Sequence, residues 1–297
     1  MKDISELLGC KYPIIQGPMG VICNPEFVSA VSEAGGYGLL ATSFETDPGK
    51  FKAKVDAVKA LTDKPFGANL MPVNPKAFEF ADILVEAGVK AVTTSGGSPK
   101  DLLPYLKERD IKVLHVVSNV SNAIKAAAAG VDAVIAEGSE SGGMQGFNGA
   151  STMVLTPLVA DAVDVPVVAA GGIGDSRGYK AAFNLGAVGV QIGTVFIAAE
   201  ECIAHANYKN ALISANELDT RLMNVEWAQF RIVATPMAEE MMAKGGPSKA
   251  EFSAQGASME EAWVKGDLKA GIIAGGQITG MIKAVRPVRE IIEEMVS

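Results

Sequence analysis

Eight short apolar runs, separated by longer amphipathic segments, fill the first 200 or so residues, and this alternation limits the fold more than any other feature. Each run is four to six residues long and apolar on both faces, as in strands covered by helices in a parallel sheet. The runs occupy residues 12–16, 37–41, 65–70, 91–94, 112–117, 133–136, 166–170 and 188–192. Strands that alternate with helical segments in this way indicate an α/β protein.

Helix starts can be recognised between the runs. Asn24, Asn74 and Ser98 each stand directly before a proline, an arrangement typical of a cap residue followed by proline at the first helical position. Asp175 can cap the segment 176–185, which ends at Gly186. Eight successive strand–helix units favour a (β/α)8 TIM barrel over the alternative, a doubly wound open sheet.

The pattern changes after residue 194. Residues 200–268 are predicted to be helical, with Ser-x-x-Glu capping boxes that begin at Ser248 and Ser258. We therefore predict a barrel formed by residues 1–199 and 270–297, and a smaller C-terminal helical subdomain on the substrate side formed by residues 200–269. The methionines of this segment are either adaptable core packing or a pliable wall for an apolar substrate.

Composition excludes several classes of protein. An apolar content of 48% argues against intrinsic disorder, and a net charge of −8 without a basic stripe argues against nucleic-acid binding. Cys10, Cys23 and Cys202 lie far apart, so they do not form a zinc framework, and we expect no metal site. Because no apolar run is long enough to span a bilayer, we expect a cytoplasmic protein without a membrane partner.

Glycine stands at most of the predicted strand ends, where the active site of a barrel forms. A tight turn explains any single glycine, but glycines at most of the strand ends predict a large flat ligand across the barrel mouth. The last two strand ends, residues 169–173 and 191–194, fit the phosphate site that barrels build after their seventh and eighth strands. Backbone amides and the Thr194 hydroxyl could bind that phosphate without a basic side chain.

Several motifs, in order along the chain, resemble one family. They are YPIIQGPM at 12–19, DKPFGAN at 63–69, AEGSESGG at 136–143, AAGGI at 169–173 and VQIGT at 190–194. Together they resemble the superfamily of nitronate monooxygenases, formerly 2-nitropropane dioxygenases, and FMN-dependent enoyl-ACP reductases. Two later segments, 205–209 and 265–267, are more similar to the enoyl reductase branch of the FabK type. The resemblance implies one FMN at the barrel mouth and NADH or NADPH as the electron donor.

The resemblance also assigns positions to the cofactor. It places Gly142 and Gly143 against the flavin ring, and Glu137 and Gln191 beside the ring or ribityl chain. Glu137 could equally be a buried carboxylate that binds loop amides. The residues implied along the isoalloxazine and ribityl are Gly17, Pro18, Met19 and Asn69, with Thr94 and Ser95 nearby. The residues implied at the phosphate are Gly171, Gly172, Gly193 and Thr194.

Position 144 departs from the family pattern. Relatives usually read Gly-Gly-His-x-Gly, with the histidine as base or substrate-orienting group, whereas this chain has Met144 after Gly142 and Gly143. A thioether neither takes up a proton nor donates a strong hydrogen bond, so a nitroalkane oxidase that depends on a base is disfavoured.

Flavin-to-alkene reduction still needs a proton, from water or from a side chain. Met144, Ser141 and Gln145 are therefore the candidate catalytic residues. Other possible donors are Cys23 and Tyr37. Of the two histidines, His115 is either functional or a core residue, and we expect His205 to be structural.

Three functions follow from these residues. The first is an FMN-dependent NAD(P)H oxidoreductase that reduces an enoyl thioester by hydride transfer from flavin N5. The second is a nitronate monooxygenase that uses FMN and O₂ on nitronates, which are already deprotonated. The third is a flavin-binding protein whose catalysis was lost or redirected with the histidine. A further alternative is a phosphosugar barrel that binds no flavin. Its purified protein would be colourless, whereas a flavoprotein is yellow. The substrate is a small molecule or an acyl thioester, and the resemblance suggests a homodimer.

Overall fold

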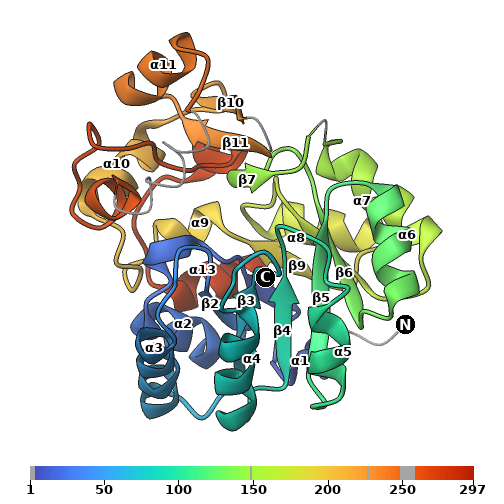
Figure 1. Ribbon diagram of the computed structural model, residues 1–297. Helices are drawn as coiled ribbons and strands as arrows, with labels where there is room; N and C mark the ends of the chain where they lie inside the picture. The colour runs from blue at the N-terminus through green and yellow to red at the C-terminus, as the bar shows by residue number, and fades with distance from the viewer. Residues whose placement is uncertain (1–3, 148, 226–227, 248–257) are drawn as a thin grey trace.

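Eight parallel strands form the central sheet of the computed structural model, which describes residues 4–147, 149–225, 228–247 and 258–297 (Figure 1). Their order in the sheet is β1-β9-β8-β6-β5-β4-β3-β2. The strands are β1 (Ile14–Gln16), β2 (Gly38–Ala41), β3 (Phe66–Leu70), β4 (Ala91–Thr94), β5 (Lys112–Val117), β6 (Ala133–Glu137), β8 (Val167–Ala170) and β9 (Val190–Ile192). All eight predicted strands are confirmed within two residues at either end.

The sheet closes on itself between β1 and the residue that precedes β2. Gln16 N–H donates to the Tyr37 carbonyl at 3.0 Å, and Tyr37 N–H donates to the Ile14 carbonyl at 2.8 Å. Ile15 and Tyr37 are parallel bridge partners. The structure is therefore a TIM barrel, as predicted, and the open doubly wound sheet is excluded.

Helices surround the barrel and link successive strands. They are α1 (Ile4–Leu8), α2 (Pro25–Glu33), α3 (Pro48–Leu61), α4 (Ala77–Glu86), α5 (Leu102–Lys107), α6 (Val120–Ala129), α7 (Thr152–Ala162), α8 (Ser176–Asn184), α9 (Thr194–Ile197) and α13 (Val288–Met295). Asp175 caps α8 as predicted, because its side chain accepts hydrogen bonds from the backbone N–H groups of Arg177 and Gly178.

Two predicted helix starts are wrong by a few residues. Helix α4 begins at Ala77 rather than after Asn74, and α5 begins at Leu102 rather than after Ser98. The Asn74 amide instead donates to the carbonyls of Thr42 and Glu45, at 3.0 and 2.9 Å. It therefore joins two loops at the barrel mouth, a long-range role that a local capping pattern does not reveal.

The barrel interior is filled by side chains that alternate along the strands. Ile15, Leu39, Leu114, Ile135 and Val168 are all fully buried and belong to one apolar cluster. The residues between them in sequence point outward, against the helices. This alternation decides which residues near the strand ends face the mouth of the barrel.

A second part lies over one end of the barrel (Figure 1). It contains the antiparallel strands β10 (Thr220–Val225) and β11 (Ala228–Val233), and β11 also pairs with β7 (Gly143–Gln145). The helical elements near it are α10 (Ala206–Ser214), α11 (Pro236–Ala243), a helical stretch at 258–263 and the 3-10 helix η2 (Gln277–Met281).

The prediction that residues 200–268 are helical throughout is therefore wrong for β10 and β11. Every residue of β11 is buried, so the strand lacks the alternation of apolar and polar residues that marks a half-exposed strand. Its partner β7 is also more than 80 residues earlier in the chain. The capping box at Ser248 lies outside the described residues, and the domain boundaries stay a prediction.

Candidate functional site

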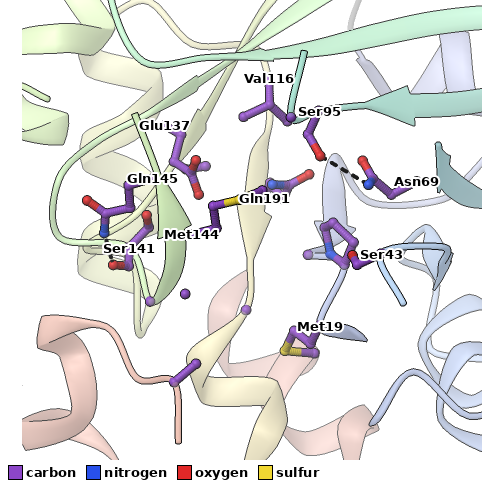
Figure 2. A pocket seen from close by; sticks show the side chains of 18 of the residues that line it. Met19, Ser43, Asn69, Ser95, Val116, Glu137, Ser141, Met144, Gln145 and Gln191 are labelled. Atoms are coloured by element: carbon purple, nitrogen blue, oxygen red, sulfur yellow. Dashed lines mark hydrogen bonds between the residues drawn. The ribbon is translucent and has the colours of Figure 1, made fainter. Parts of the chain in front are cut away.

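A cavity of about 1120 Å³ opens at the carboxyl ends of the barrel strands and is also lined by residues of β7 and β11. Figure 2 shows side chains of its wall. Nearly all the residues predicted for the site line it, and Thr94 is the exception. Those that line it are Gly17, Pro18, Met19, Asn69, Ser95, Glu137, Ser141, Gly142, Gly143, Met144, Gln145, Gly171, Gly172, Gln191, Gly193 and Thr194. A cavity larger than the roughly 300–1,000 Å³ typical of small-molecule sites has room for a cofactor and a second ligand.

Thr94 is buried behind the cavity wall instead of lining it. Its Oγ1 lies 2.8 Å from Nδ1 of His115, with which it forms a buried pair. The preceding residue, Thr93, faces the other way and donates to Asn69 Oδ1 at 2.9 Å. Asn69 in turn donates to Ser95 Oγ at 3.1 Å (Figure 2). Thr93 therefore orients the Asn69 amide, a role that depends on which face of β4 points inward.

The ends of β8 and β9 form a cradle of backbone groups. Gly171 and Gly172 have φ of 89° and 72°, a left-handed conformation that favours glycine. The hydroxyl of Thr194 accepts a hydrogen bond from Gly276 N–H at 3.0 Å. The sequence analysis did not assign Gly276 to the site, because its glycine-rich segment lies more than 80 residues beyond Thr194.

The loop between β6 and β7 presents backbone to the cavity. Gly143 has φ of 81°, and a Cβ placed on it would meet no atom within 4 Å, so its face is open. At Gly142 a Cβ would lie 2.6 Å from Gly276 N, so only glycine allows this close approach. Gln145 donates to the carbonyls of Ser139 and Ser141 (Figure 2). Both contacts hold the loop in place, so the Gln145 amide serves this loop rather than a reacting group.

Two polar side chains in the cavity wall lack the partners that buried groups normally have. Among the described residues, Ser141 Oγ and Gln191 Oε1 are buried without a hydrogen-bond partner. Beside them, burial raises the pKa of the Glu137 carboxyl from 4.5 to about 7. A buried polar atom without a protein partner gains stability when a ligand supplies its hydrogen bond.

The other candidate proton donors do not face the cavity as free groups. The Tyr37 hydroxyl donates to the carbonyls of Ala91 and Phe66 inside the barrel, and burial raises its pKa. Cys23 Sγ accepts from Gln16 Nε2 and Met19 N–H, and burial raises its pKa to about 12. His205 caps α10 through a hydrogen bond from Asn207 N–H. His115 does line the cavity, but burial lowers its pKa to about 4, so it is neutral at pH 7.

Met144 lies in the cavity on β7, opposite Phe230 of β11 (Figure 2). A Cβ on Gly96 would lie 2.6 Å from Met71 Cε and 3.4 Å from Met144 Cε, so two thioethers meet here. Met71, Phe230 and the aromatic residues Phe44 and Trp263 also line the cavity, and sequence reasoning did not find them. The density of methionine was the one available signal.

The described residues contain neither a metal site nor a membrane-spanning helix. No cluster of three or more His, Cys, Asp or Glu side chains there could hold a metal ion. No helix in those ranges is long and apolar enough to cross a membrane.

The chain is a TIM barrel with a large, glycine-lined cavity at its mouth. These features are typical of barrel proteins that bind their ligand at the carboxyl ends of the strands. The profile of the nitronate monooxygenase family matches residues 2–297, and the chain belongs to this family of FMN-dependent oxidoreductases.

Relatives within the family differ in their reactions. FabK from Thermotoga maritima is 36% identical, with a TM-score of 0.90 over 100% of this chain and 95% of that one. A probable nitronate monooxygenase from Staphylococcus saprophyticus is 34% identical over 75% of each chain. Nitroalkane oxidase from Streptomyces ansochromogenes is 25% identical, with a TM-score of 0.86 over 98% of this chain and 96% of that one.

Proposed function

We propose that this chain is an FMN-dependent oxidoreductase that reduces the carbon–carbon double bond of an enoyl thioester with electrons from NADH or NADPH. The likeness to FabK from Thermotoga maritima over the whole chain supports this reaction. The observation that carries it is Met144, which stands in the cavity where the family pattern has histidine. When bound, FMN would supply two-electron transfer between the nicotinamide and the alkene.

The residues of the cavity fit this cofactor. Gly143 offers an open backbone face on which a flat ring can lie, because nothing would touch a Cβ there within 4 Å. The buried oxygens of Gln191 and Ser141 have no hydrogen-bond partner in the protein, a lack that polar atoms of the cofactor would fill. Asn69 would contribute its amide from the opposite wall, held by Thr93 and Ser95. The phosphate would lie in the cradle of Gly171, Gly172, Gly193, Thr194 and Gly276.

Met144 favours alkene reduction over nitroalkane oxidation. Oxidation of a neutral nitroalkane requires a base that removes a proton from carbon, and a thioether cannot do this. Alkene reduction needs no such base at the start, only a proton delivered to the second carbon. Glu137 is the cavity group whose pKa, about 7, lies nearest neutrality, and we assign its carboxyl as the proton source.

The test is an anaerobic assay of NADH and NADPH oxidation by the FMN-loaded protein, with crotonyl thioester as substrate. We expect turnover that depends on the thioester and yields its saturated product. Yellow, FMN-loaded protein that turns over no enoyl thioester with either donor would refute the proposal. In that case, recovery of reductase activity by Met144→His would identify a flavin protein whose catalysis was lost.

Nitronate oxidation is a second candidate, favoured by the similarity to the probable nitronate monooxygenase of Staphylococcus saprophyticus. Nitronate anions have already lost the proton that Met144 cannot remove. Oxygen uptake with propionate 3-nitronate, together with no turnover of enoyl thioesters, would favour this function over alkene reduction.

A further inference from the structure

One side of the cavity differs chemically from the glycine-rich floor. Six side chains form it, two of them from the helical stretch at 258–263, and we refer to them as the apolar wall. They are Met19, Phe44, Phe230, Met259, Trp263 and Ile272. All except Met19 and Phe44 are buried. Met19 is the one member that the family resemblance places along the flavin, and the proposed cofactor gives the other five no role.

The aromatic groups at the wall present hydrocarbon to the cavity. Trp263 Nε1 donates to the Ile272 carbonyl at 2.8 Å, so its one polar atom is already satisfied. The neighbouring Tyr208 donates its hydroxyl to the Ala274 carbonyl at 2.7 Å, and the two rings lie 5.7 Å apart. Since these polar atoms are paired with backbone, the wall recognises a ligand through apolar contact.

Charge also argues for an apolar occupant. Among the described residues that line the cavity, Lys125 is the only lysine or arginine, and it belongs to α6 rather than to the wall. A dinucleotide phosphate or a free carboxylate would find no cation on this side. A hydrocarbon chain requires none.

The wall begins at the reacting end of the cavity and continues to the surface. Phe230 is the register partner of Met144, which places it beside the proposed reaction site. At the other end, a Cβ on Gly20 would lie 3.4 Å from Phe44 and 3.7 Å from Trp263, so these two rings are neighbours. Phe44 is 38% exposed, so the wall reaches solvent at this end.

We propose that the apolar wall binds the acyl chain of the thioester, and that the enzyme selects chains longer than the four carbons of crotonyl. The inference rests on the proposed function for the identity of the substrate. The chain would run from Phe230 past Trp263 to Phe44, with the thioester carbonyl near Met144. Each CH₂ buried along this path strengthens binding by about fourfold.

Calorimetric titration of the FMN-loaded protein with butyryl-, octanoyl- and dodecanoyl-CoA tests the wall without turnover. We expect affinity to rise by at least tenfold from butyryl to octanoyl. Phe44→Lys should reduce the ratio of dodecanoyl to butyryl affinity by at least tenfold, whereas Phe44→Leu should keep it within threefold. Phe78→Lys is the matched control, since Phe78 is 44% exposed on α4 and does not line the cavity.

The outcomes separate this inference from the proposed function. Equal affinity for all three chain lengths, or an equal loss in Phe44→Lys and Phe78→Lys, overturns the acyl-chain site even if crotonyl thioester is reduced. Affinity that rises with chain length supports the site even if no enoyl thioester is turned over, and the failure then belongs to the proposed reaction.

Discussion

Met144 lies on β7, with Phe230 as its register partner and the Met71 side chain nearby. The other residues of β7, Gly143 and Gln145, carry no charge, so a histidine at position 144 would have no charged neighbour on this strand. Met144→His would place a group that takes up protons at neutral pH inside the cavity. We expect at least a tenfold gain in oxygen uptake with a neutral nitroalkane, and a smaller change with the corresponding nitronate. Met144→Gln is the control, because an amide is polar but not basic. An equal gain in both variants would show that base chemistry is not the cause.

Glu137 predicts a pH dependence of stability. Its pKa is raised from 4.5 to about 7, so between these pH values the folded chain keeps a proton that the unfolded chain releases. The free energy of unfolding therefore falls as pH rises from about 4.5 to 7, and the full penalty remains above that range. Glu137→Gln should remove this decline, so that its Tm rises relative to the wild type as pH increases. Calorimetry measures Tm across this pH range, with Glu293→Gln, at an exposed position, as the control. Tm curves of Glu137→Gln and the wild type that stay parallel with pH would contradict the prediction.

At the scale of elements, three segments far apart in sequence meet at the proposed phosphate cradle. Gly276 N–H donates to Thr194 Oγ1, and Gly142 packs directly against Gly276. A Cβ on Gly276 would lie 2.8 Å from the Glu140 carbonyl and 3.0 Å from Thr194 Oγ1. We therefore expect Gly276→Ala to weaken FMN binding at least tenfold, measured as flavin absorbance per protein and by titration of the apoprotein.

Gly149→Ala provides the control for that experiment. A Cβ on Gly149 would make only ordinary contacts, 3.7 Å from Ser139 Cβ, and Gly149 does not line the cavity. Equal flavin content in the two variants would contradict the role assigned to Gly276.

Strands were predictable because their signal is local, whereas contacts between elements were not. The eight barrel strands are buried on both faces, so each one appears in the sequence as a short, continuous apolar run. Thr94 was assigned to the cavity, but the alternation fixed by the closed barrel turns Thr93 inward instead. Phe44 and Trp263 belong to segments more than 200 residues apart, so no local pattern could place them side by side.

At the scale of the whole molecule, the site belongs to both parts of the chain. The barrel supplies the glycine-rich floor, and β11 and the stretch at 258–263 supply much of the apolar wall. Because β7 leaves the barrel to join β11, the loop that carries Met144 depends on the second part for its position. The homodimer suggested by the family resemblance stays a prediction.

The contact between Gly276 and Thr194 also orders events during synthesis of the chain. A ribosome makes the barrel strands first, and β9 is complete more than 80 residues before Gly276 is added. All eight barrel strands therefore exist before the last wall of the proposed cradle is made. The proposed phosphate cradle is consequently complete only near the end of translation, and a chain cut short before residue 276 would lack both the Gly276 N–H and helix α13.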